Sequence, residues 1–162
     1  MKKRKKFKAR VYRDSWNIDN SFYKWVLPRL KCFIEYADGY PDTVYKSFDE
    51  FIDDIREKIK WVEFLDIVNN GTHKNIDTKK LIESVWNENL LDVYIPNWKE
   101  QLENAKHDNE IRNTEEYKNK LPDCFKSLNI NWVEVIKEYL MTSVLAEAFG
   151  EWFGKNYFYL WW

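Results

Sequence analysis

The sequence predicts an all-α protein, folded as a helical bundle of four or five helices. Two observations favour helices over strands. Apolar residues recur at helical spacing over several long stretches, and the 162 residues include only four glycines and four prolines. A sandwich or barrel would need more of these turn-forming residues. Hydrophobic residues make up 44% of the chain, so it can bury a core. We expect residues 1–13 to form a basic arm and residues 14–162 a single helical domain.

The first helix is expected to begin at Asp19 or Asn20, whose short side chains can accept hydrogen bonds from the first turn. Asp38 and Gly39 mark its end, since glycine tolerates the left-handed backbone found after many helices. The apolar stripe between these ends has helical spacing. It consists of Phe22, Val26, Leu30, Phe33, Ile34 and Ala37.

Pro28 lies inside this first helix. A proline in a helix interior removes one backbone hydrogen bond and clashes with the preceding turn, at a cost of about 3 kcal/mol. The sequence therefore predicts a kink at Pro28, tolerated because both halves are well packed. A second interpretation is that the bend and the carbonyl group of Lys24 form part of a pocket, which Arg29 and Lys31 would flank.

The second helix has the clearest start. Ser47 and Glu50 have the spacing of a capping box, in which each side chain satisfies a backbone amide of the first turn. Apolar residues then keep helical spacing to about Asn69. The acidic residues near the start suit the positive end of the helix dipole, which explains them better than a metal site does.

Glu63 borders the apolar stripe of this second helix, so we expect it to be partly buried. A buried carboxylate needs a partner, and Arg29 or Lys155 would serve. A role as a catalytic acid is the less favoured alternative, because structural ion pairs perturb carboxylates as active sites do.

A third helix is expected from Asp77 or Thr78 to about Tyr94, with Pro96 after its end. A fourth begins near Trp98 and continues into a very polar stretch. That stretch, near residues 99–120, is predicted to be an exposed helical arm or a linker, because it carries few apolar residues.

The last helix is expected to begin at Asn129 or Asn131 and to run past Phe153. Its apolar face covers more than half of the circumference, so it should lie at the centre of the bundle or face a second copy of the chain. Gly150 and Gly154 would allow a close approach to such a copy. The aromatic end of the chain, residues 157–162, should be anchored against the first helix or at a dimer interface.

Charge is distributed unevenly along the chain. Residues 1–13 hold eight basic and no acidic residues, whereas the remainder holds 18 basic and 27 acidic residues. Such an arm is typical of a solvated terminus, but it could also bind nucleic acid or the acidic face of another copy. No apolar run follows it as in a signal peptide. No stretch reaches the roughly 18 apolar residues of a membrane span.

The sequence contains few of the residues that most catalytic sites require. It holds two histidines, His73 and His107, without a second ligand at metal spacing, and no glycine-rich phosphate loop. We therefore expect no cofactor, no metal and no enzymatic activity. Cys32 and Cys124 are expected to be reduced thiols, with Cys32 as a small core residue.

Residues 16–41 carry a resemblance to a known group of proteins. They contain Trp16-Asn17-Ile18-Asp19, then Trp25-Val26-Leu27-Pro28-Arg29-Leu30-Lys31, then Gly39-Tyr40-Pro41. These motifs, in this order, resemble a set of small uncharacterised bacteriophage proteins. The resemblance resumes weakly near residues 48–51 and returns at residues 153–162. It implies the cytoplasm of an infected bacterial host, and it brings no activity with it.

Two functions fit these observations. The first is a non-enzymatic phage accessory protein that binds and inhibits a host protein, with a defence protein as the expected target. Aromatic residues and arginine dominate binding energy at protein interfaces. The alternative is a binder that sequesters a nucleotide signal or a single-stranded nucleic acid by aromatic stacking and phosphate contacts. The residues expected to bind a ligand or partner are Trp16, Arg29, Lys31, Tyr40, Lys155, Trp161 and Trp162.

Overall fold

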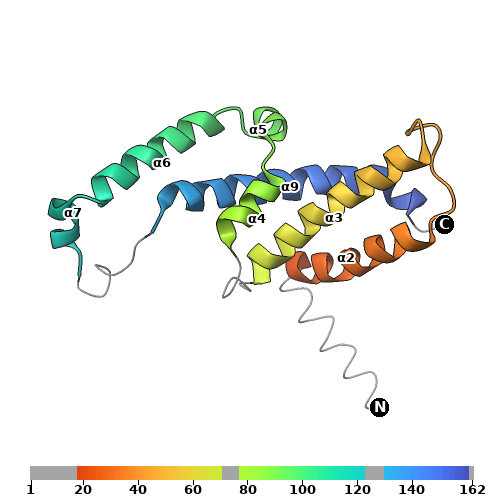
Figure 1. Ribbon diagram of the computed structural model, residues 1–162, viewed down its shortest axis with the longest axis horizontal. Helices are drawn as coiled ribbons and strands as arrows, with labels where there is room; N and C mark the ends of the chain where they lie inside the picture. The colour runs from red at the N-terminus through yellow and green to blue at the C-terminus, as the bar shows by residue number, and fades with distance from the viewer. Residues whose placement is uncertain (1–17, 71–76, 123–129, 161–162) are drawn as a thin grey trace, which may run out of the picture. The chain divides into compact units, whose positions relative to one another are not determined.

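The computed structural model describes residues 18–70, 77–122 and 130–160 (Figure 1). Within these ranges the regular structure is entirely helical, which confirms the predicted all-α class. The elements are α2 (Ile18–Tyr36), α3 (Phe48–Asn70), α4 (Thr78–Val85), α5 (Glu88–Tyr94), α6 (Trp98–Arg112), α7 (Glu115–Lys120), α9 (Trp132–Asn156) and the short 3-10 helix η2 (Tyr157–Tyr159).

The predicted number of four or five helices is wrong, because the described residues form seven α-helices. Two expected helices are each divided in two by a capping residue. The side chain of Asn87 accepts a hydrogen bond from the Leu90 amide at 3.1 Å and begins α5. The side chain of Thr114 accepts from the Tyr117 amide at 3.3 Å and begins α7. A capping side chain begins a new helix and so interrupts the preceding one, even where the apolar pattern continues across it.

The kink expected at Pro28 is not supported, since α2 continues as one helix through this residue. Val26 and Leu30 are fully buried on either side of it, and α2 packs along α3. Packing on both sides of the proline stabilises the continuous helix at the cost of one backbone hydrogen bond. Gly39 differs from expectation too. It lies beyond the end of α2 and does not take the left-handed backbone conformation.

The chain divides into two compact units. The first comprises Met1–Ile76 and Phe149–Trp162 and contains α2, α3 and the last turns of α9. In this unit the Phe22 ring of α2 lies 5.3 Å from Phe153 and 6.1 Å from Phe149, measured between ring centroids. Leu160 is buried just after η2. These contacts anchor the described end of the chain on α2, as predicted, while Trp161 and Trp162 lie outside the described residues.

The second unit, Asp77–Ala148, contains α4 to α7 and the first part of α9. The polar stretch after Trp98 is helical, and α6 buries Trp98, Leu102 and Ala105 on one side. Asn109 of α6 reaches the start of α9, where its side-chain oxygen accepts from the Trp132 amide at 2.8 Å. Such a contact satisfies a donor that has no partner within the helix.

Gly150 and Gly154 lie within α9, and a Cβ atom added at either position would meet open space. Glycine in a helix interior costs roughly 0.5–1 kcal/mol relative to alanine. We therefore expect Gly150→Ala and Gly154→Ala each to raise the free energy of unfolding by about that amount, measured by denaturant titration. The expectation applies to the single chain, so the titration is done at a dilution at which copies do not associate; a loss of stability there would contradict the open space at both glycines.

Candidate binding pocket

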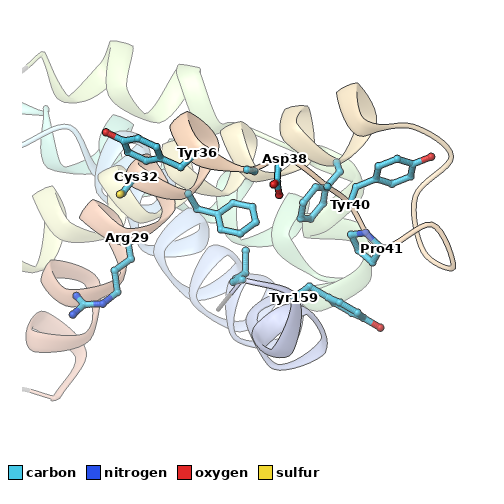
Figure 2. A pocket seen from close by; sticks show the side chains of 12 residues that line it. Arg29, Cys32, Tyr36, Asp38, Tyr40, Pro41 and Tyr159 are labelled. Atoms are coloured by element: carbon cyan, nitrogen blue, oxygen red, sulfur yellow. The ribbon is translucent and has the colours of Figure 1, made fainter. Parts of the chain in front are cut away.

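A pocket of about 700 Å³ opens in the first unit, at the end of α2. Its volume lies in the range of about 300–1,000 Å³ that is usual for ligand sites. Figure 2 shows Arg29, Cys32 and Tyr36 at one end, and Tyr40, Pro41 and Tyr159 at the other. The complete lining consists of Arg29, Cys32, Phe33, Tyr36, Ala37, Asp38, Gly39, Tyr40, Pro41, Phe51, Tyr159 and Leu160.

We call this site the aromatic pocket, because its lining includes the rings of Phe33, Tyr36, Tyr40, Phe51 and Tyr159. Phe33 and Phe51 meet edge to face with their centroids 5.8 Å apart. Three tyrosines at its edge are exposed, with Tyr36 at 78%, Tyr159 at 42% and Tyr40 at 38%. Exposed aromatic rings beside an apolar hollow offer a large contact area at low entropic cost, which is typical of a surface that binds a partner.

Arg29 is the one cation among the described residues that line the pocket, and Trp25 of α2 holds it in place. Its guanidinium carbon lies 4.4 Å from the Trp25 ring centroid, and its Nη1 donates to the Trp25 carbonyl oxygen at 2.7 Å. A cation over an indole face is stabilised by the ring quadrupole. Figure 2 shows the guanidinium directed away from Asp38, which lines the same pocket.

Acidic residues outnumber basic ones among the described residues that line the aromatic pocket and their sequence neighbours, where the basic ones are Arg29 and Lys31. Asp38 lines the pocket, and Glu35 and Asp42 each adjoin a lining residue in the sequence. All three carboxylates are exposed, and none forms an ion pair within the described part of the chain. A ligand with basic groups beside an apolar anchor would therefore match both features of this surface.

Asp54 of α3 joins the two segments that lead to Pro41 and Tyr159, at one end of the aromatic pocket (Figure 2). Its Oδ2 accepts hydrogen bonds from the Tyr45 hydroxyl at 2.6 Å and from the Trp152 indole nitrogen at 2.5 Å. Its Oδ1 lies 2.9 Å from the Lys58 ammonium group. Asn156 completes this Asp54 cluster, since its Oδ1 accepts from the Tyr45 hydroxyl at 3.4 Å.

Lys58 and Asn156 are buried polar residues of this cluster, with exposed fractions of 6% and 5%. The Lys58 ammonium also lies 2.7 Å from Glu57 and 3.8 Å from the Trp61 ring centroid. Buried charges persist when they are paired and hydrogen-bonded, as here. The cluster therefore has the contacts of a structural support, which holds the end of α9 against α3.

The structure brings together two of the expected binding residues, Arg29 and Tyr40, in the aromatic pocket. Two others lie elsewhere in ion pairs. Lys31 pairs with Glu63 at 2.6 Å, and the exposed Lys155 lies 3.9 Å from Glu151. The three expected tryptophans are outside the described residues; they are Trp16, Trp161 and Trp162.

Two side chains differ from expectation. Cys32 is exposed and lines the aromatic pocket, so the expectation of a core residue is wrong. It lies three residues after Arg29 on α2, which turns it toward the pocket rather than toward α3. Glu63 has Lys31 as its partner instead of Arg29 or Lys155, and both side chains of the pair are about half exposed. An exposed pair of this kind contributes about 0–1 kcal/mol.

Sequence reasoning missed Tyr36, Asp38 and Tyr159 as pocket residues. Tyr36 could have been found, because it lies at the end of α2 outside the apolar stripe and beside a turn. Tyr159 belongs to the aromatic end that was expected to pack on the first helix or at a dimer interface, but no local pattern indicates that it lines a pocket there. A second hollow of about 440 Å³ lies in the second unit, where Lys137 is 5.2 Å from the Trp86 ring centroid. The lining of this second hollow contains both lysines and glutamates, and none of its residues was predicted to bind a ligand.

Searches against family models, curated proteins and solved structures gave no match to this chain. Among the described residues, no three histidine, cysteine, aspartate or glutamate side chains gather as metal ligands would. In the same residues, no helix combines the length and apolar character needed to cross a membrane. We therefore base the proposed function on the aromatic pocket.

Burial raises the pKa of the Tyr45 hydroxyl well above its ordinary value of 10.0, and its hydrogen bond to Asp54 raises it further. The folded protein then holds this proton more tightly than the unfolded chain does. This contribution to stability is complete below about pH 10 and is lost as the pH rises further. We expect the free energy of unfolding of Tyr45→Phe to fall less than that of the wild type between about pH 9 and pH 11.

The matched control is Tyr139→Phe, which removes the hydroxyl of an exposed tyrosine in the second unit. It should keep the alkaline slope of the wild type. At neutral pH Tyr45→Phe should also lose about 1–2 kcal/mol, because it removes a hydrogen bond to a charged acceptor. Equal slopes for the three proteins would contradict the assignment of this proton to the Asp54 cluster.

Proposed function

We propose that this protein is a non-enzymatic binding protein that holds a segment of another protein in the aromatic pocket. The observation that carries the proposal is the set of exposed tyrosines around an apolar hollow with acidic surroundings. Tyrosine, tryptophan and arginine supply most of the binding energy at protein interfaces. The segment that fits best is an apolar or aromatic anchor with lysine or arginine beside it.

The character of the pocket favours a protein segment over a nucleotide. Phosphate groups need several cations or backbone amides around them. Arg29 alone supplies a cation to the lining, and it is stacked on Trp25. The carboxylates of Glu35, Asp38 and Asp42 would repel a polyanion. The exposed acidic residues thus weigh against the capture of a nucleotide signal or of single-stranded nucleic acid at this site.

The biological setting of the proposal rests on the sequence resemblance. The part of the aromatic pocket formed by residues 29–41 lies within the stretch that resembles small bacteriophage proteins. We propose that the protein acts in the cytoplasm of an infected bacterium, where it binds and inhibits a host protein that takes part in defence. Inhibition requires no catalytic group, because occupying the partner's functional surface is sufficient.

Association with a second copy through α9 is part of this proposal. The open faces of Gly150 and Gly154 on that helix support it. Small residues on a helix surface permit a close approach of a neighbouring helix. Such a contact would leave the aromatic pocket to the host protein, because no residue of α9 lines it.

The test is affinity capture from lysate of the infected host, with mass spectrometry of bound proteins and bound small molecules. We expect Tyr36→Ser together with Tyr159→Ser to reduce the amount of captured partner at least tenfold, since each hot-spot ring contributes roughly 2 kcal/mol or more. Both rings are exposed, so the substitutions should leave the fold intact.

Tyr139→Ser is the matched control, because Tyr139 is similarly exposed at 61% but lies outside the pocket lining. It should capture the partner as the wild type does. Two results would contradict the proposal: capture that survives the loss of both pocket tyrosines, or the recovery of a nucleotide instead of a protein.

A further inference from the structure

The basic arm is the largest feature of the sequence that the proposed function does not use. Residues 2–13 carry eight lysines and arginines and no acid, and three larger apolar residues stand among them. These are Phe7, Val11 and Tyr12. The arm thus combines apolar anchors with adjacent positive charges. These are the two features of a ligand that would match the aromatic pocket.

The aromatic pocket offers the complementary surface in the same molecule. Its apolar walls include Phe33 and Phe51, and its surroundings carry the carboxylates of Glu35, Asp38 and Asp42, none of which forms an ion pair with another described residue. Positive groups placed beside these carboxylates would gain attraction that falls with ionic strength. An aromatic anchor would add the salt-independent burial of an apolar ring.

The length of the arm permits this contact within one chain. Phe7 lies eleven positions before Ile18, the first residue of α2, and these eleven steps can span at most about 36–40 Å when extended. Along α2, the rise from Ile18 to Arg29 is about 16 Å and to Tyr36 about 27 Å. An arm that turns back along α2 therefore reaches the aromatic pocket, with length to spare.

We propose that the basic arm binds in the aromatic pocket of its own molecule, with Phe7 against the aromatic walls and the adjacent lysines and arginines against the carboxylates. The arm then acts as an internal ligand. A partner segment with an apolar anchor and positive charges has to displace the arm before it can bind. This displacement rests on the proposed function, whereas the contact between the arm and the pocket does not.

The exposed thiol of Cys32 in the pocket provides the test. In the full chain with Cys124→Ser, Ala9→Cys places a second thiol two residues after Phe7. Under mild oxidation we expect one disulfide within a monomer, identified by mass spectrometry after digestion. The reaction requires no host protein, so its failure would leave the proposed function standing.

Two matched charge-reversal variants test whether the disulfide forms because the arm binds in the pocket or only because both thiols belong to one chain. Asp38→Lys with Asp42→Lys should slow disulfide formation about tenfold, because the altered pocket repels the arm. Asp108→Lys with Glu110→Lys makes the same change in net charge on exposed residues of the second unit and should leave the rate unchanged. Circular dichroism checks that each variant remains helical.

A second variant acts on the arm instead of the pocket. Replacing Lys2, Lys3, Lys5 and Lys6 with glutamine should slow the reaction as the pocket reversal does, and about 1 M salt should do the same. The proposal is overturned if no disulfide forms, or if all variants react at one rate. Covalent dimers in place of the monomer bond would overturn it too, and would assign the arm to a second copy.

Discussion

Asp54 is the carboxylate on which the arrangement of the first unit depends. It accepts hydrogen bonds from Tyr45 and Trp152 and pairs with Lys58, so one side chain joins α3 to two other segments. Removing it would leave the buried Lys58 ammonium with Glu57 alone as its ion-pair partner among the described residues. Losing one of two carboxylates beside a buried ammonium is costly, because the remaining partner compensates less of the buried charge.

The same cluster holds the two segments that form one end of the aromatic pocket, where Pro41 and Tyr159 lie (Figure 2). On one side, the amides of Val44 and Tyr45 donate to the Pro41 carbonyl oxygen at 2.9 and 3.0 Å, so the turn that carries Pro41 is fixed where Tyr45 meets Asp54. On the other side, η2 and Tyr159 follow directly after Asn156 of the cluster. The pocket is thus formed before any ligand arrives, which lowers the entropic cost of binding.

The sequence predicted those features whose causes lie within a few residues. The expected cap at Ser47 is present, with Ser47 Oγ accepting from the Glu50 amide at 3.1 Å, whereas the Glu50 side chain accepts from the Lys46 amide at 2.8 Å and not from that of Ser47. The breaks before α5 and α7 were missed because the apolar and polar patterns continue across Asn87 and Thr114. Each of these residues had a suitable capping side chain, but capping competes with helix continuation and tertiary packing decides between them.

The pocket was harder to predict than the helices. Arg29 and Tyr40 were expected to bind because they lie beside the apolar stripe and its turn, and both line the pocket. The contact between Asp54 and Trp152 joins residues 98 positions apart, and no periodic pattern encodes it. Contacts of this kind position Tyr159 beside α2, so the completed pocket becomes visible only in three dimensions.

Amide hydrogen exchange in Asp54→Asn tests most directly whether this one carboxylate holds the pocket together. If it does, exchange at Val44, Tyr45 and Leu160, whose amides donate within the two pocket segments, accelerates about tenfold or more. Amides of α6 in the second unit keep their wild-type rates. Unchanged exchange at the three pocket amides, or an equal acceleration throughout the chain, would contradict the account.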